Sequence, residues 1–260
     1  MKRIAFFVNT YRDADQVIAN DLRDFVQAKG HVVALQDADE CDFAVVLGGD
    51  GTMLAAAKKF AQFGTPLLGI NMGQLGYLTD AEVAHSKESL EKLLSGKFKI
   101  EKRIMLNVDI NGCKNLALND VVIHRGVNPR PIRLRLAIDD EHVDSFTADG
   151  LIIATPTGST AYNLSAGGPL LKPDAGMVAI TPICSHSTFE RPLVVQPNEG
   201  ITIFADGLLQ TGIACDGEPV KFDETDECMI KIGVSKFVTN IVKTHDLSFY
   251  ETFRAKMKKR

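Results

Sequence analysis

The sequence predicts an α/β N-terminal domain with a parallel sheet, followed by a mostly antiparallel all-β C-terminal domain. Before residue 100, short apolar runs alternate with helix-length segments, which is typical of a parallel sheet covered by helices. After residue 100, helical periods nearly vanish and short strand-like runs dominate, which is typical of antiparallel sheets. We therefore expect domains at residues 1–103 and 104–236, with a short junction near Lys102 and Arg103.

The N-terminal elements follow from this alternation. Strands are expected at Arg3–Val8, Val32–Leu35, Phe43–Leu47 and Pro66–Ile70, and helices at Ala14–Lys29, Thr52–Gln62 and Lys87–Leu94. Gly30 follows the first helix, and glycine is the commonest residue at the C′ position that ends a helix. Phe43–Leu47 is continuously apolar, as expected for a strand buried on both faces of a parallel sheet.

The C-terminal elements are short strands. They are expected at Met105–Ile110, Val121–His124, Ile132–Ile138, Leu151–Ala154, Leu193–Val195, Ile201–Phe204 and Met229–Ile232. Ile132–Ile138 alternates cleanly between apolar and polar residues, and the polar run 139–142 supplies a turn to a partner strand.

Composition excludes several classes of protein. A formal charge of −4 and a pI near 5.9 argue against a nucleic-acid binder held by phosphate contacts. No apolar stretch approaches ~18 residues and no signal peptide is present, so we expect no membrane partner and a cytoplasmic location. Five scattered cysteines without a CxxC pair predict reduced, mostly buried thiols. The basic run 256–260 is expected to be solvated.

The glycine-rich stretch GGDGT lies between an expected strand and an expected helix. Gly48, Gly49 and Gly51 lack Cβ atoms and let the backbone approach a ligand, while free amides at the helix N-terminus form an anion site near Thr52. Beside a phosphate, the Asp50 carboxylate would be repelled unless it holds a metal or takes a proton from a hydroxyl nucleophile. The alternative is a tight turn in which Asp50 is the helix N-cap.

A second loop, TPTGST at residues 155–160, follows the expected strand Leu151–Ala154. Its four hydroxyls and one glycine form a dense set of donors that can wrap a diphosphate without lysine or arginine. The alternative is a Ser/Thr-rich surface loop followed by a capped helix.

Five motifs occur in the order and spacing of bacterial NAD kinases: GGDGT at 48–52, Asn119-Asp120, TPTGSTAY at 155–162, SAGGP at 165–169 and Cys215-Asp216-Gly217. The chain therefore resembles this family over nearly its whole length. GGDG is shared with diacylglycerol and sphingosine kinases, whereas TPTGSTAY in a strand-rich half is far more specific. The resemblance implies the NAD kinase fold with an active site in the interdomain cleft. It also implies that the tail from about residue 237 packs back on the N-terminal domain.

The resemblance implies ATP-dependent and Mg²⁺-dependent phosphorylation of the 2′-hydroxyl of the adenosine ribose of NAD, giving NADP. Asp50 is expected to be the general base, with Gly51 near the ribose and phosphates. Asn119 and Asp120 are expected to bind the adenosine and ribose portions of NAD. Further nucleotide-binding residues are expected at Gly48, Gly49, Thr52, Tyr77, Arg130, Asp149, Thr157, Thr160, Ala161, Tyr162, Asn163, Leu164 and Ser165. Magnesium or another divalent ion is the expected cofactor, with no metal ligand assigned.

Partners follow from the same resemblance. NAD and ATP are the expected small-molecule partners, with polyphosphate as the alternative donor, and the chain is expected to form a homodimer or homotetramer. Four positions depart from the family pattern. Asp120 replaces a common Glu, Thr147 a common Arg, Leu78 an aromatic residue and Glu218 a common Gln.

Other functions remain as alternatives. A diacylglycerol- or sphingosine-type lipid kinase would need an amphipathic or apolar docking segment, and the sequence contains no candidate for one. A non-catalytic dinucleotide sensor could keep the same loops, but it would not need Asp50. A Rossmann dehydrogenase is disfavoured because the turn after the first strand, residues 9–13, lacks the GxGxxG pattern.

Overall fold

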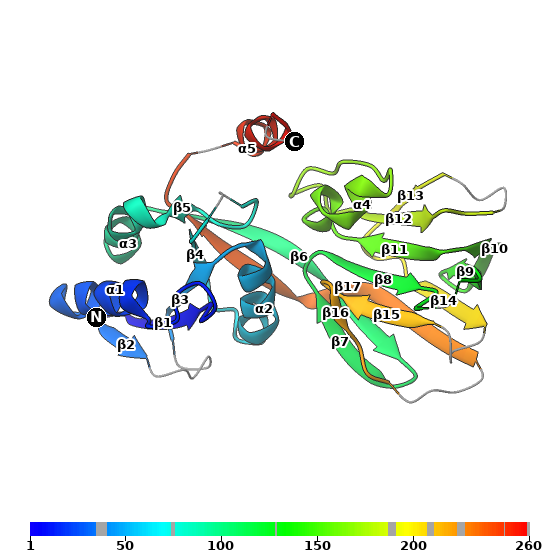
Figure 1. The fold of residues 1–260 in the computed structure, drawn as a ribbon, viewed down its shortest axis with the longest axis horizontal. Helices are drawn as coiled ribbons and strands as arrows, with labels where there is room; N and C mark the ends of the chain where they lie inside the picture. The colour runs from blue at the N-terminus through cyan, green and yellow to red at the C-terminus, as the bar shows by residue number, and fades with distance from the viewer. Residues whose placement is uncertain are drawn as a thin grey trace. The chain divides into compact units, whose positions relative to one another are not determined.

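The computed structural model describes residues 1–34, 41–73, 76–127, 129–186, 191–206, 211–222, 227–246 and 248–258. The chain forms two compact units, one comprising Met1–Arg103 with Phe237–Arg260 and the other comprising Ile104–Lys236 (Figure 1). The first unit is therefore built from two separate stretches of the chain, whereas the second is one continuous stretch.

The first unit contains a parallel sheet whose strands run in the order β2-β1-β3-β4, with β5 and the end of β17 also paired to β4. These strands are β1 (Arg3–Val8), β2 (Val32–Ala34), β3 (Phe43–Gly48), β4 (Leu67–Asn71), β5 (Ala81–Glu82) and β17 (Glu227–Lys243). The helices are α1 (Val17–Ala28), α2 (Asp50–Phe60), η2 (Ala61–Phe63), η3 (Val83–His85), α3 (Ser86–Leu94) and α5 (Phe249–Met257). One apolar core joins α1 and α3 to the sheet through Leu22, Val45, Ile70 and Leu90.

Helix α1 begins three residues later than the sequence predicts, at Val17 instead of Ala14. Gln16 adopts a left-handed conformation (φ 51°), which interrupts the helical path. The carboxylate of Asp13 accepts two amides of the first turn at 3.3 and 2.9 Å, so it satisfies donors that no earlier carbonyl can reach. The prediction for Gly30 is confirmed, because it follows the helix at φ 79°.

The returning segment after residue 236 is fixed within the first unit. Ile241 of β17 pairs with Leu67 of β4, and Asn240 Nδ2 donates to the Gly64 carbonyl at 3.0 Å. The buried carboxylate of Asp80 accepts both the amide and the hydroxyl of Thr244, at 3.0 and 2.5 Å. These contacts make residues from two distant parts of the sequence necessary for one core.

The second unit contains two antiparallel layers. One has the order β10-β9-β14-β17, with a β6–β7 hairpin joined to β17, and the other has the order β13-β12-β11-β8-β15-β16. The strands are β6 (Lys99–Ile110), β7 (Cys113–Ala117), β8 (Asp120–His124), β9 (Ile132–Ile138), β10 (Glu141–Ala148), β11 (Gly150–Ala154), β12 (Val178–Ile183), β13 (Leu193–Val195), β14 (Ile201–Asp206), β15 (Gly212–Cys215) and β16 (Glu218–Pro219). Two short helices follow β11, namely η4 (Gly158–Thr160) and α4 (Tyr162–Ser165).

Alternation along the strands separates two apolar clusters in the second unit. Ile123 and Ile153 belong to the main core, which residues of both antiparallel layers share. Val122 and Ile152 belong to a smaller cluster on the opposite face, packed against Leu171. The loop that follows β11 is therefore held against the sheet by apolar contacts.

The predicted fold class is confirmed, with a parallel sheet in the N-terminal region and antiparallel sheets after it. The bounds of β1, β9 and β13 agree with the sequence prediction, whereas β2 ends at Ala34 and Leu35 lies outside the described residues. The sequence reasoning missed α5. Its signal was a capping box, in which the Ser248 side chain accepts the Glu251 amide and the Glu251 side chain accepts the Ser248 amide.

The five cysteines are free, as predicted, but the prediction that they are mostly buried is wrong. Cys215 and Cys228 are buried, whereas Cys184 is exposed at a turn with φ 46°. Burial raises the pKa of the Cys228 thiol to about 11. Within the described residues, no helix combines the length and the apolar character that crossing a membrane requires.

Candidate active site

The GGDGT turn joins the end of β3 to the start of α2. Gly49 is the N-cap and Asp50 is the first helical residue, so the alternative in which Asp50 caps the helix is wrong. No described side chain caps α2, which leaves the first amides of this helix without an intrahelical partner. A Cβ at Gly48 would overlap with the Thr52 side chain, so the turn requires glycine there.

Two backbone amides fix the Asp50 carboxylate. The Tyr77 amide donates to Oδ2 at 2.8 Å, and the Leu78 amide donates to Oδ1 at 3.0 Å. A Cβ at Gly76 would overlap with Oδ1, so a glycine is needed for the carboxylate to reach these amides. The Asp50 side chain stays about one-third exposed, at 32%, and is therefore accessible to a ligand.

A lysine from the C-terminal helix α5 completes this cluster. Lys256 Nζ lies 3.6 Å from Asp50 Oδ2 and 4.0 Å from the centroid of the Tyr77 ring. The expectation that the basic run 256–260 is simply solvated is therefore wrong for Lys256, while residues 259 and 260 lie outside the described part of the chain. The cluster brings a carboxylate, a cation and an aromatic ring together.

A second cluster lies at one end of the sheet that contains β8, β11 and β15. The Asp216 carboxylate accepts the amides of Leu118 and Asn119 at 2.9 and 2.7 Å, and its own amide donates to the Asp120 carbonyl at 3.0 Å. Asp216 adopts φ 55°, a conformation that aspartate tolerates better than most residues. It therefore fixes the backbone of the predicted substrate-binding pair.

Asp120 is almost fully buried, at 5% exposure. Burial raises the pKa of its carboxyl from 3.8 to about 7, and the negative charge of Asp216 acts in the same direction. Near neutral pH, Asp120 can therefore be a hydrogen-bond donor as well as an acceptor.

The TPTGST loop packs directly on Asn119. Its first residue, Thr155, donates through its amide to the Asn119 carbonyl at 2.9 Å and through its hydroxyl to the Leu118 carbonyl at 2.6 Å. A Cβ at Gly158 would overlap with the Asn119 carbonyl, so this close approach requires glycine. Three of the five motifs thus meet at one end of the sheet.

The hydroxyls of this loop stabilise the loop itself. Ser159 donates to the Pro156 carbonyl at 2.7 Å, and Thr160 donates to the Thr157 carbonyl at 3.3 Å. These bonds hold the loop in one conformation. The expectation that its amides and hydroxyls wrap a diphosphate stays a prediction.

The following segment, residues 160–165, combines a buried anchor with an exposed ring. Asn163 is fully buried, accepts from the Thr181 hydroxyl at 2.7 Å and donates to the Pro169 carbonyl at 3.0 Å. Tyr162 is 46% exposed and is the residue of this segment that presents an aromatic surface. Ala161, Leu164 and Ser165 lie beside it, around the start and end of α4.

The predicted residues Asp149 and Arg130 lie elsewhere. Asp149 precedes β11, at the opposite end of that strand from the TPTGST loop, and pairs with Arg125 Nε at 3.0 Å. Arg130 is exposed after β8. Within one chain, the structure does not bring Asp149 to the TPTGST loop.

The sequence analysis did not predict the roles of three groups at the site: the Leu78 amide, Lys256 and the carboxylate of Asp216. Leu78 itself is buried, so its contribution comes from its backbone and not from the missing aromatic ring. Glu218, another departure from the family pattern, is exposed on β16.

Comparisons with known proteins identify the family of this chain. Two family models match, the ATP-NAD kinase N-terminal domain over residues 6–98 and the ATP-NAD kinase C-terminal domain over residues 118–244. An NAD kinase of Caldanaerobacter subterraneus subsp. tengcongensis is 42% identical over 226 residues, which covers 84% of this chain and 79% of the relative. An NAD kinase of Clostridium botulinum is 35% identical over 277 residues, which covers 99% and 96%.

Two solved structures are also similar. An NAD kinase from Archaeoglobus fulgidus in complex with ATP gives a TM-score of 0.82 at 27% identity, covering 99% of both chains. Yeast NADH kinase complexed with NADH gives a TM-score of 0.85 at 24% identity, covering 99% of this chain and 88% of the other, and shows likeness of fold. The fold and the glycine-rich turn together place the chain among the kinases that have a GGDG motif. Within that class, the chain belongs to the NAD kinase family, whose enzymes phosphorylate NAD with ATP.

Proposed function

We propose that the chain transfers a phosphoryl group from ATP to the 2′-hydroxyl of the adenosine ribose of NAD, with Asp50 as the general base. The observation that carries this proposal is the Asp50 carboxylate, held by the Tyr77 and Leu78 amides and still partly exposed. Each carboxylate oxygen has two lone pairs, so one amide bond to each oxygen leaves a lone pair for the proton of a hydroxyl.

The donor phosphates bind at the open N-terminus of α2. Unpartnered helix amides and the helix dipole favour an anion there, and the glycines at 48 and 49 let it approach. Lys256 Nζ, 3.6 Å from Asp50, adds a cation that stabilises negative charge on the transferred group.

Magnesium fits this site as an ion that binds mainly through the nucleotide. Among the described residues, no three His, Cys, Asp or Glu side chains gather as a metal-binding group. Mg²⁺ usually keeps several waters and binds through substrate phosphates, so an ion held mainly by ATP does not require such a group. The ion would neutralise charge on the transferred phosphoryl group.

The acceptor dinucleotide binds to Asn119 and Asp120. Bonds from Asp216 and Thr155 fix the backbone of Asn119 on both sides, which holds the Cα from which its side chain extends. The exposed ring of Tyr162 provides a flat surface for a base.

Product analysis tests the proposal. The purified protein is incubated with NAD, ATP and Mg²⁺, and NMR locates the new phosphate on the dinucleotide. We expect phosphate on the adenosine 2′-oxygen and no product in excess chelator. Phosphate at another position contradicts the proposed acceptor hydroxyl. Full activity in excess chelator contradicts the metal requirement. A sensor without activity would bind NAD and give no product.

Light scattering tests the proposed homodimer or homotetramer.

The general base is tested by Asp50→Asn. Asparagine keeps the size of the side chain but cannot take the proton, so we expect kcat to fall by about 10²–10⁴-fold. Asp42→Asn is the matched control, since Asp42 also accepts a backbone amide, from Arg3 at 2.6 Å, in an exposed position before β3. A kcat of Asp50→Asn equal to that of the control removes Asp50 from this role.

A further inference from the structure

Asn71, the last residue of β4, carries a polar group that the described structure leaves unused. Its side chain is 2% exposed, and its Nδ2 atom has no hydrogen-bond partner among the residues that the structure describes. A buried amide donor without a partner is costly to the fold, because it has lost its bonds to water. Such a group in a native protein calls for an explanation, and an absent ligand is one.

The position of Asn71 relates it to the GGDGT turn. Asn71 pairs with Gly48 across the β3–β4 ladder, and the next amide, that of Met72, donates to the Gly48 carbonyl at 3.1 Å. A Cβ placed on Gly49 would lie 3.9 Å from Asn71 Oδ1, so the amide group of Asn71 is next to the N-cap of α2.

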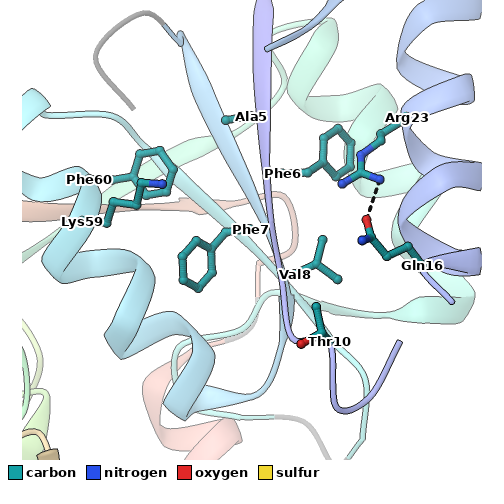
Figure 2. A pocket seen from close by; sticks show the side chains of 9 residues that line it. All are labelled: Ala5, Phe6, Phe7, Val8, Thr10, Gln16, Arg23, Lys59 and Phe60. Atoms are coloured by element: carbon teal, nitrogen blue, oxygen red, sulfur yellow. Dashed lines mark hydrogen bonds between the residues drawn. The ribbon is translucent and has the colours of Figure 1, made fainter. Parts of the chain in front are cut away.

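Sheet topology independently marks the carboxyl ends of β1 and β3, and β3 leads into the GGDGT turn. The chain leaves β1 through α1 toward β2 and leaves β3 through α2 toward β4, so the two connections depart in opposite directions from neighbouring strands. Figure 2 shows the result around β1, with Phe7 directed toward Phe60 of α2, and with Phe6 beside Arg23 of α1 on the other side of the strand. Ligands of open α/β sheets bind at the carboxyl ends of the strands where the connections diverge.

The cavity drawn in Figure 2, of about 220 Å³, is a different place. Its lining follows β1 from Ala5 to Val8 and continues to Thr10, and it includes neither Asn71 nor any residue of the GGDGT turn. At the strand ends, a cation faces the same loop as Asn71, because Arg12 Nη1 donates to the Met72 carbonyl at 3.0 Å.

We propose that Asn71 Nδ2 is a hydrogen-bond donor to a phosphate oxygen of ATP, next to the open N-terminus of α2. This inference rests on the proposed function for the identity of the ligand. ATP supplies an acceptor that the described residues do not provide, and Asn71 positions the donor phosphates against the helix amides. Asn71 is a substrate-binding residue that the family resemblance does not assign.

The test combines binding and stability on Asn71→Ala. Titration calorimetry with ATP alone should show affinity lower by about 10- to 100-fold, as for loss of a hydrogen bond to a charged group. NAD affinity should be unchanged. The melting temperature without ligand should be equal to or above that of the wild type, because the variant removes a buried donor that no partner satisfies.

Asn240→Ala is the matched control. Its amide lies in the same unit but is satisfied by the Gly64 carbonyl at 3.0 Å, so this variant should lose some stability and keep its ATP affinity. Asn71→Asp is a second variant of nearly equal volume. Its carboxylate repels phosphate, so ATP should bind more weakly to it than to Asn71→Ala.

Several outcomes overturn the inference. Wild-type ATP affinity in both Asn71 variants, a loss of NAD affinity without loss of ATP affinity, or a fall in melting temperature of Asn71→Ala as large as that of Asn240→Ala each contradict it. If the wild-type protein makes no NADP while Asn71→Ala still loses ATP affinity, the proposed function fails and the ATP contact of Asn71 stands.

Discussion

Two aspartates of this protein, Asp50 and Asp120, lie in opposite environments. The carboxylate of Asp50 is partly exposed and accepts one amide on each oxygen. The carboxyl of Asp120 is buried beside Asp216, and burial raises its pKa to about 7. The first is suited to accept a proton from a substrate, and the second to bind a polar group without bearing a full charge.

Stability should depend on pH through Asp120. Its pKa in the folded state, about 7, lies above the value of 3.8 that applies to the unfolded chain, so the folded state binds more protons between these values. Stability therefore falls as pH rises from about 4 to about 7. Since one pH unit of difference corresponds to about 1.4 kcal/mol, the effect is on the order of 4 kcal/mol.

Urea unfolding of the wild type and of Asp120→Asn measures this effect. Asparagine does not ionise, so this variant does not lose stability through residue 120 as pH rises. The free energy of unfolding of Asp120→Asn minus that of the wild type should therefore increase between about pH 4 and about pH 8. A difference that stays constant over this range would show that Asp120 does not titrate as described.

At the scale of elements, the positions of the proposed site residues depend on how loops approach strand ends. The segment 76–78 reaches Asp50 because Gly76 has no side chain, and the Gly76 amide is held by the Thr79 hydroxyl at 3.0 Å. In the second unit, Gly158 and Asp216 hold the TPTGST loop and the Asn119 backbone in the same way. These contacts hold both loops in place, which favours a preorganised site.

Gly76→Ala should therefore displace the Asp50 carboxylate. A misplacement of about 1 Å at a reacting group can cost about 100-fold in rate, so kcat should fall by that order. The matched control is Gly233→Ala on β17, where a Cβ meets no atom within 4 Å. Steady-state kinetics and melting curves of both variants separate the effect on activity from the effect on stability. Equal kcat values would show that the loop relaxes without moving Asp50.

The sequence predicted the motifs better than it predicted their contacts. GGDGT and TPTGST could be identified because glycine and hydroxyl residues interrupt apolar runs at strand ends. The bond from the Leu78 amide to Asp50 and the approach of Lys256 could not, because both depend on how distant segments pack. The Ser159 hydroxyl could be recognised as a donor, but its acceptor is a carbonyl three residues earlier, which composition does not specify. Helix α5 was predictable from its capping box and was overlooked.

For the whole molecule, the important feature is that one unit is continuous and the other is not. The main core of the second unit draws all its residues from within 104–236. The core of the first unit includes Val242, and its buried Asp80 needs the amide and hydroxyl of Thr244. Removing one partner of a buried charge is strongly destabilising.

Fragments that correspond to the two units should differ in whether they fold alone. The fragment 104–236 should unfold cooperatively on heating, whereas the fragment 1–103 should not, because it lacks Thr244 and the β17 pairing at Ile241. The matched control is 1–103 joined to 237–260 through a flexible linker, which should recover cooperative unfolding. Circular dichroism against temperature measures all three. Cooperative unfolding of 1–103 alone would show that the returning segment is dispensable.

The contact of Thr244 with Asp80 also sets an order of events on the ribosome. Residues 1–103 emerge first, but the chain must extend by about 140 more residues before Thr244, the partner of Asp80, is made. At about 5–20 residues per second, this interval lasts roughly 7–28 s. During it, the second unit can complete its core while β4 presents an unpaired edge at Leu67, a surface prone to association with other nascent chains. The part of the protein that is synthesised first is thus the part that finishes folding last.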